Sequence, residues 1–505
     1  MVFKRREKPL NISGAFLLPT DRSHTASVLI FTLLLGFGLA PSLFLALIPQ
    51  PLGIYPGQRF FGCYLFWLAT CGCFAAISFS RASKVDLRPF LLSLPLLGLF
   101  ALGDALWTQQ YQVEPLLFIF FFAGSALLGG LLAKTRQDMS FVKGLQVSVV
   151  ILSFFYGLIA FLNYGFGISD QRYSVDDYVI WGFLNIRYWS HLASWFFPII
   201  ALTSISNPFP SFRLLRVASF ISGSIWWWIL LSTAGRGSAL GVGLSALLVL
   251  ILFRRDAFPL MRAMVIHFFS GILLWIFFTV FLPWVLGGSV ELRQVDAESS
   301  GRIPLWIEAW AMSLVNFPFG MGPQSWLTHD ILNPEWRSAL SFAHPHNMYL
   351  FWAAEYGWLS VVALLLMLAG GVSKLVGRFR RESLERDDSQ RIVAITSAIS
   401  AAFVHAGVSA VFIGPASLIA GFFIISAGWA LGFSQDTIIS KRAPYKRTVL
   451  LRCVFVLALC ASIVVGVRWV QEVERYYEDN LIDRETYKGR GYAPRFWSHG
   501  DFPRQ

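Results

Sequence analysis

The feature that most constrains this chain is a series of long apolar stretches. A helix needs about 20 mostly apolar residues to cross a bilayer. Thirteen stretches approach or exceed that length, near residues 27–48, 57–79, 89–107, 115–133, 142–163, 188–205, 215–233, 237–253, 263–286, 347–373, 392–412, 415–433 and 449–469. Backbone inside lipid must satisfy its own hydrogen bonds, so such stretches fold as helices. The sequence therefore predicts an all-α polytopic membrane protein with 12–13 transmembrane helices.

The composition agrees with a chain that is surrounded by membrane lipid. Only 14% of the 505 residues are charged and 56% are hydrophobic, whereas a soluble domain carries about 25% charged residues. The five cysteines fall within apolar stretches, which predicts no disulfide framework. The net charge of +12 has no basic stripe interleaved with exposed aromatic residues, so no nucleic-acid partner is expected.

The distribution of lysine and arginine predicts how the chain is oriented. Loops that alternate along the chain hold 26 basic residues on one side and, before the C-terminal tail, 7 on the other. Cytoplasmic loops carry the excess of basic residues, so residues 1–26 form a cytoplasmic N-terminal segment. Residues 27–469 form a single transmembrane domain, and an odd number of spans places the tail, residues 470–505, on the opposite side.

The longest segment on the non-cytoplasmic side covers residues 287–346. A connection of this length usually has a function of its own. Within it, residues 301–317 have apolar side chains at helical spacing, namely Ile303, Trp306, Ile307, Trp310 and Leu314. They predict an amphipathic helix that lies on the membrane surface or packs as a cap on the helical bundle.

Arginine dominates the charge on the non-cytoplasmic side, where seven arginines and no lysine precede the tail. The guanidinium group binds phosphate as a planar fork. Arg187 lies at the mouth of a predicted span, Arg236 lies between two spans with almost no loop, and Arg302 opens the amphipathic helix. Each could snorkel or pair with an acid, but ionisable groups at this depth suggest function. A bound diphosphate would satisfy all three.

Histidines end the long outer segment, at His344 and His346. A neutral imidazole can take a proton from a hydroxyl, because its ordinary pKa lies near neutrality. Two alternatives are a metal shared with His329, which no carboxylate or cysteine pattern supports, and a structural histidine at a helix start. Glu355 could orient a partner or be a buried helix carboxylate. No acid pair on this side has the spacing of a metal site or a glycosidase dyad, so no metal or other cofactor is expected.

Four segments carry a resemblance to a known family: residues 182–187 continuing to His191 and Pro198, residues 232–238, residues 300–306 followed by 316–322, and His346-Asn347 followed by Gly357. In this order, over about residues 180–370, the chain resembles the O-antigen ligase/O-antigen polymerase superfamily of bacterial envelope enzymes. It departs from the family at Ser360, where glycine, threonine or tyrosine is usual. Serine is small, so helix packing should be preserved.

The resemblance implies a division of roles among these residues. Arg187, Arg236 and Arg302 would hold the diphosphate of an undecaprenyl diphosphate-linked glycan, and His346 would activate the acceptor hydroxyl, with Arg302 also acting in catalysis. The supporting positions are Asn185, His191, Asn347 and Glu355. The implied location is the bacterial inner membrane, with the active site and the C-terminal tail in the periplasm.

The function implied is that of a metal-independent glycosyltransferase, in which arginines stabilise the charge that develops on the departing lipid diphosphate. The leading hypothesis is O-antigen ligation onto lipid A–core. The alternatives with the same donor are polymerisation onto a second glycan and transfer to a protein hydroxyl by a protein O-oligosaccharyltransferase. A lipid-linked glycan transporter would show internal repeats and cationic residues near the midplane, and the sequence shows neither.

Overall fold

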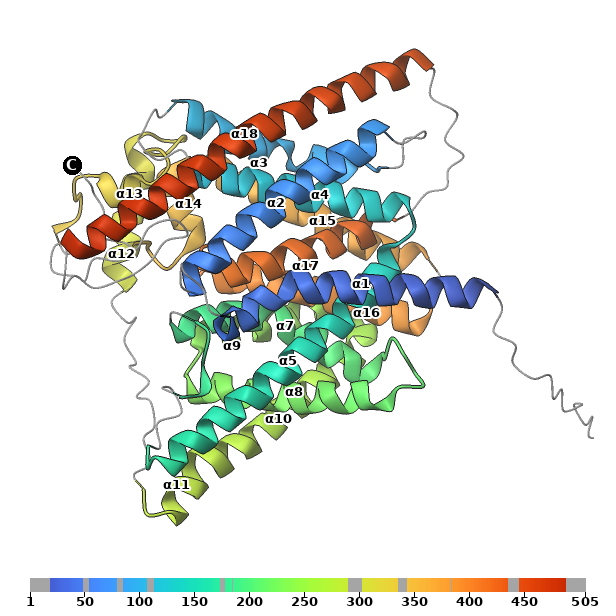
Figure 1. Ribbon diagram of the computed structural model, residues 1–505, viewed down its shortest axis with the longest axis vertical. Helices are drawn as coiled ribbons and strands as arrows, with labels where there is room; N and C mark the ends of the chain where they lie inside the picture. The colour runs from blue at the N-terminus through green and yellow to red at the C-terminus, as the bar shows by residue number, and fades with distance from the viewer. Residues whose placement is uncertain are drawn as a thin grey trace, which may run out of the picture.

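A computed structural model describes residues 19–48, 54–79, 85–106, 113–172, 178–183, 185–288, 302–334, 343–382, 384–434 and 445–486 (Figure 1). Residues 1–18 of the predicted N-terminal segment, residues 289–301 and 335–342 of the long outer segment, and residues 487–505 of the predicted tail lie outside this description. Every regular element among the described residues is a helix. The predicted all-α fold is confirmed.

A helix occupies each of the predicted apolar stretches. The first half of the chain forms α1 (Pro19–Phe44), η1 (Leu45–Leu47), α2 (Ile54–Phe79), α3 (Arg88–Leu106), α4 (Val113–Lys134), α5 (Asp138–Ser169), α7 (Ile186–Ile205) and α8 (Arg213–Ser232). The second half forms α9 (Arg236–Phe253), η2 (Arg254–Ala257), α10 (Phe258–Trp275), the π-helical η3 (Ile276–Phe281), α11 (Leu282–Val285), α12 (Arg302–Val315), α13 (Ser325–Thr328), α14 (Met348–Tyr356), α15 (Trp358–Arg381), α16 (Arg386–Ala406), α17 (Pro415–Phe433) and α18 (Tyr445–Thr486).

Nine helical segments of the described chain are long and apolar enough to cross a membrane. One of them joins α9 to α11 without interruption. Three further helices occupy predicted spans but fall outside this count. They are the apolar helix α3, and α7 and α16, which carry polar side chains that face the protein interior. The chain is therefore a polytopic, multi-pass membrane protein.

Helix α17 forms the centre of the bundle (Figure 1). All of its residues are buried, and it contacts α4, α15, α7 and α1. A Cβ atom at Gly129 of α4 would lie 2.3 Å from the Cβ of Trp429, so only glycine permits α4 and α17 to approach this closely. The outer helices instead expose large apolar side chains, such as Phe37 at 77% and Leu457 at 68%. Such surfaces require a lipid environment.

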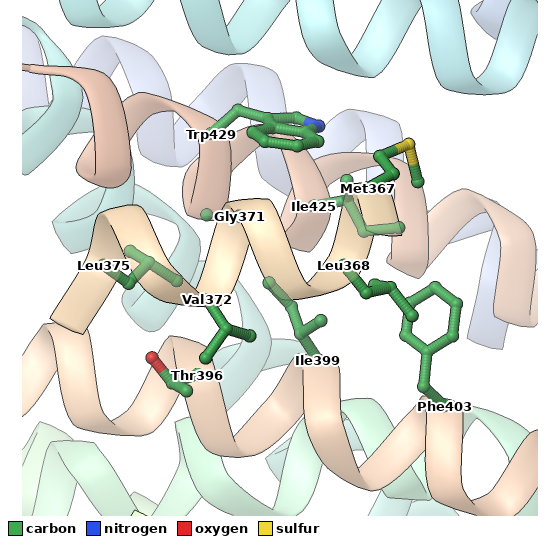
Figure 2. Close-up of a pocket in the computed structure, with 11 residues that line it drawn as sticks. Met367, Leu368, Gly371, Val372, Leu375, Thr396, Ile399, Phe403, Ile425 and Trp429 are labelled. Carbon is green, nitrogen blue, oxygen red and sulfur yellow. The ribbon is translucent and has the colours of Figure 1, made fainter. Parts of the chain in front are cut away.

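The centre of the bundle also contains a small void between α15, α16 and α17 (Figure 2). Its volume is about 30 Å³, and its lining, which includes Gly371, Ile399 and Trp429, is almost entirely apolar. A small apolar cavity gives a water molecule no hydrogen-bond partner and stays dry. We therefore regard it as a packing gap between helices and not as a ligand site.

The ends of the helices define two faces of the bundle. At one end lie α12, α13 and α14, together with the last turns of α18, and α1 begins at the opposite end (Figure 1). We call these the α12 end and the α1 end. At the α1 end, Arg378 pairs with Asp138 at 2.8 Å and with Glu382 at 2.9 Å, and it donates to the carbonyl of Leu431. This cluster fastens α5, α15 and α17 together.

The predicted amphipathic helix is present as α12, with slightly narrower bounds. Leu305, Ala309 and Met312 are buried on a helix that packs against α14. Most of the predicted apolar stripe is 45–53% exposed, namely Ile303, Ile307, Trp310 and Leu314. One face of α12 thus caps the bundle while the other offers an apolar surface outward, so both interpretations of this helix are compatible.

The helices differ from the predicted stretches at two places. The apolar stretch 347–373 is two helices, α14 and α15, which meet at Gly357 with a φ of +82°. A Cβ atom at Gly357 would lie 2.0 Å from the carbonyl oxygen of Pro318. Ser360 is buried, and its hydroxyl donates to the Gly357 carbonyl at 2.7 Å. At the C-terminus, α18 continues to Thr486, so residues 470–486 of the predicted tail extend a helix.

The break between α14 and α15 has a cause outside the two helices. The amide of Met321 donates to the carbonyl of Ala354 at 2.8 Å, and that of Gly322 donates to Glu355 at 2.9 Å. These bonds occupy carbonyl groups at the end of α14 that lack helical partners. The segment that follows α12 therefore ends α14 and determines the direction in which α15 leaves.

We predict that Gly357→Ala destabilises the protein, because alanine is strained at this φ and its Cβ would collide with Pro318. The free energy of unfolding should fall by at least ~2 kcal/mol. Gly243→Ala in α9 is the matched control, since nothing lies within 4 Å of its added Cβ. Thermal unfolding of the detergent-purified proteins measures both effects, and equal midpoints for the two variants would contradict the prediction.

Candidate functional site

The side chains singled out in the sequence lie at the starts of four helices. Arg187 is in the first turn of α7, Arg236 opens α9, Arg302 opens α12, and His346 lies just before α14. The first N–H groups of a helix have no partner within the helix, and the helix dipole is positive there. Helix starts of this kind attract anions. The site therefore adds guanidinium groups to backbone that already favours negative charge.

The three arginines act on one another electrostatically. Burial lowers the pKa of the Arg302 guanidinium, and the charges of Arg187 and Arg236 lower this pKa further. The Nε atom of Arg302 is buried and has no hydrogen-bond partner within the described part of the chain. Like charges in a partly buried setting repel, and a bound anion would remove that repulsion.

His346 is buried next to this arginine cluster. His346 is 7% exposed. Its φ of +56° lies in the left-handed region, which residues other than glycine seldom adopt. Its amide donates to Nδ1 of His344 at 3.2 Å, and the two rings lie 4.3 Å apart. Asn347 then begins α14 by accepting a hydrogen bond from the amide of Leu350 at 3.1 Å.

The surroundings of His346 keep its imidazole neutral. Burial, followed by the charges of Arg187 and Arg302, lowers the pKa of His346 to about 3. At neutral pH the ring is therefore unprotonated and can accept a proton. Arg187 and Arg302 are the charges that act on this imidazole, so these two arginines lie near His346 at the α12 end.

Two of the supporting residues lie at the start of α7. The Oδ1 atom of Asn185 accepts a hydrogen bond from the Arg187 amide at 2.9 Å and so caps the helix that presents this arginine. His191 is buried one turn further along, with Nε2 2.7 Å from the Oγ atom of Ser409. Asn185 therefore fixes the start of α7, and His191 holds this helix against the segment that contains Ser409.

Glu355 and His329 have structural contacts elsewhere. The Oε1 atom of Glu355 accepts a hydrogen bond from the amide of Trp326 at 3.1 Å, which ties α14 to α13. His329 places Nε2 2.6 Å from Oε1 of buried Glu308, so the geometry gives no support to a metal shared with His344. Among the described residues, no group of three or more His, Cys, Asp or Glu could hold a metal ion.

A buried polar network beneath the arginines was not anticipated. His405 of α16 places Nδ1 2.8 Å from the Oγ atom of Ser194 in α7, and that hydroxyl bonds Ser238 of α9 at 2.9 Å. The rings of His405 and His191 lie 5.2 Å apart. The network joins α7 and α9, which carry two of the arginines. A histidine within the apolar stretch 392–412 was the signal that could have revealed it.

Arg59 of α2 is a further cation near this end. Its Cζ atom lies 4.6 Å from the centre of the Tyr55 ring, and that ring lies 5.4 Å from the ring of Tyr188. Tyr188 directly follows Arg187, so α2 reaches the start of α7 through two tyrosines. Arg59 is one of the seven arginines that the sequence places on the non-cytoplasmic side. The sequence gave no signal for this contact, because it joins helices far apart in the chain.

These features define a class of protein, namely a multi-pass membrane protein with arginines gathered at helix starts at one end of its bundle. Residues 220–365 match the family model described as O-antigen ligase. The predicted resemblance is confirmed for this segment, which is similar to the O-antigen ligase family. The matched segment contains Arg236, Arg302 and His346, whereas Arg187 precedes it. No curated protein and no solved structure matches the chain.

We predict that the purified protein binds inorganic pyrophosphate through the arginine cluster. Binding to the folded state should raise the midpoint of thermal unfolding. Arg302→Gln should weaken the affinity at least about tenfold, because it removes a charge-assisted contact to the anion. The control is Arg172→Gln, which removes an exposed arginine that donates to the hydroxyl of Tyr178. If Arg302→Gln bound pyrophosphate as tightly as the control, the cluster would not be an anion site.

Proposed function

We propose that this protein is a glycosyltransferase that moves a glycan from undecaprenyl diphosphate to an acceptor hydroxyl on the periplasmic face, and that its reaction is O-antigen ligation onto lipid A–core. The observation that carries the proposal is a neutral, buried His346 beside arginines at the starts of three helices. The O-antigen ligase match supports the donor class. The distribution of lysine and arginine supports a periplasmic α12 end.

The proposed reaction assigns binding and proton transfer to different groups. Arg187, Arg236 and Arg302 bind the diphosphate of the donor. The acceptor oxygen forms a bond to the anomeric carbon, the bond from that carbon to the diphosphate oxygen breaks, and undecaprenyl diphosphate leaves. The arginines stabilise the negative charge that develops on it, in a setting that needs little reorganisation. His346 takes the proton of the acceptor hydroxyl.

Donor binding also makes His346 a stronger base. In the free protein, burial and the charges of Arg187 and Arg302 hold its pKa at about 3. A diphosphate between the arginines offsets their charge, so the pKa of the imidazole rises towards its ordinary value. A general base is most effective when its pKa lies near the working pH. His346 therefore gains strength as a base once the donor is in place.

The membrane side of the site suits a lipid-linked donor. Ile303, at the start of the exposed apolar stripe of α12, directly follows Arg302. A polyprenyl chain attached to a diphosphate at Arg302 can therefore pass straight into lipid, while the glycan extends toward the aqueous phase. The start of α12 would therefore lie between the polyprenyl chain of the donor, in lipid, and its glycan, in water.

Deletion of the gene in its bacterium tests the function directly. We predict loss of all long-chain lipopolysaccharide with the lipid A–core intact, because ligation is the last step of its assembly. Complementation with His346→Ala should give the same phenotype as deletion. A band with a single repeat would instead indicate polymerisation, and an unchanged ladder would contradict both reactions.

The His346→Ala protein also separates chemistry from binding. It should insert into the membrane at the normal level and bind inorganic pyrophosphate as the wild type does, because the arginine cluster is intact. Full transfer activity of this variant in purified form would show that His346 is not the base.

The pH dependence should differ between kcat/KM and kcat. The acid limb of kcat/KM reports the free enzyme, where the lowered pKa keeps His346 neutral from pH 7 down to about pH 5. The acid limb of kcat reports the donor complex, in which the pKa of His346 is higher, so kcat should begin to fall at a higher pH than kcat/KM. Coincident limbs near the ordinary histidine pKa of about 6.5 would rule out this coupling.

A further inference from the structure

A large cavity lies at the α1 end, away from the arginine cluster. Its volume is about 1010 Å³, and it is bounded by the end of α7, the starts of α8, α10 and α16, and η2. Four guanidinium groups line it, those of Arg216, Arg255, Arg262 and Arg386, with Asp387 as the only carboxylate among the described lining residues. The lining therefore carries a strong excess of positive charge.

The position of these arginines on their helices adds to that excess. Arg386 opens α16 and Arg216 lies in the first turn of α8. Arg255 lies in η2, the turn that leads directly into α10. A helix start is positive, and cations are favourable at the other end of a helix. In the part of the chain that the structure describes, none of the four lining arginines forms an ion pair. An anion in the cavity would offset both the side-chain and the helix charges.

Basic residues at this end also orient the protein in the membrane. Orientation depends on how many basic residues the loops contain and not on where in the loops their side chains point. It does not explain why four arginines from separate segments face one cavity. The cavity therefore calls for an account beyond orientation.

The remaining walls of the cavity are largely apolar. Phe220 of α8 and Phe258 and Ile266 of α10 line it and are 42–58% exposed. The same two helices expose further apolar side chains, such as Val217 and Phe269, which face lipid in a membrane. The cavity thus combines a basic region at the α1 end with an apolar wall that continues along the outside of the bundle.

We propose that this cavity binds the phosphate headgroup of an anionic phospholipid in the leaflet at the α1 end, with its acyl chains along α8 and α10. Guanidinium groups bind phosphate as forks, and basic pockets between transmembrane helices hold anionic headgroups. A soluble phosphate shares the headgroup chemistry but makes no use of the apolar wall. The site is separate from the proposed donor site, so it adds a lipid ligand to the proposed function.

Native mass spectrometry of the detergent-purified protein tests this site with phosphatidylglycerol and phosphatidylcholine as probes. The wild type should bind phosphatidylglycerol at least about tenfold more tightly than phosphatidylcholine. The double variant Arg216→Gln/Arg262→Gln should lose this preference. The matched control is Arg380→Gln/Arg381→Gln, which removes the same charge from exposed positions at the same end, outside the cavity lining. It should retain the preference.

Several outcomes would overturn the proposal. One is an equal loss of binding in the control, which would indicate a general effect of charge. Another is displacement of phosphatidylglycerol by inorganic phosphate at equal concentration, which would indicate a soluble anion. If the double variant Arg216→Gln/Arg262→Gln fails to insert into the membrane, Arg216→Lys/Arg262→Lys takes its place. It keeps the positive charge but loses the two guanidinium groups that bind phosphate as forks. It should weaken phosphatidylglycerol binding severalfold, and unchanged binding would refute the site. Because the measurement is lipid binding, its failure leaves the proposed transfer reaction untouched.

Discussion

The arrangement at the α12 end depends on holding three like charges together. Arg187, Arg236 and Arg302 repel one another and the positive helix starts that present them, so the cluster does not form by its own attraction. The rest of the bundle has to hold it in place. Helix α17, buried along its whole length, fixes α7, and the His405–Ser194–Ser238 bonds fix α9 against α7. The apolar packing of the bundle thus opposes an electrostatic cost that a bound anion would remove.

The sequence reveals the parts of this protein that local physics decides. Lipid forces an apolar stretch to satisfy its own backbone, so the spans could be predicted, and an arginine at the mouth of a span is conspicuous because its burial is costly. The break at Gly357 could not be predicted, because it depends on a segment distant in the sequence. The amides of Met321 and Gly322 bond the last carbonyl groups of α14 and so end that helix. Glu355 illustrates the same limit, since its contact with Trp326 exists only once α13 has folded back.

Burial distinguishes the two basic regions of the molecule. At the α12 end, His346 is almost fully buried and Arg302 half-buried, so burial and the nearby arginine charges lower the pKa of the histidine. At the α1 end, Arg216, Arg255 and Arg262 are exposed, where water screens them. Such a region can hold an anion without altering the acid–base properties of its neighbours. The first environment suits proton transfer and the second suits binding alone.

The site also extends beyond the segment that matches the O-antigen ligase family. Residues 220–365 supply Arg236, Arg302 and His346, but Arg187 comes from α7, which α17 and α16 hold in position. The edge-to-face contact between Tyr55 and Tyr188 links α2, with Arg59, to the same helix. Helices from both halves of the chain must therefore pack before the cation cluster is complete. A variant that loosens α17 or the network beneath α9 should disturb the arginines even though it touches none of them.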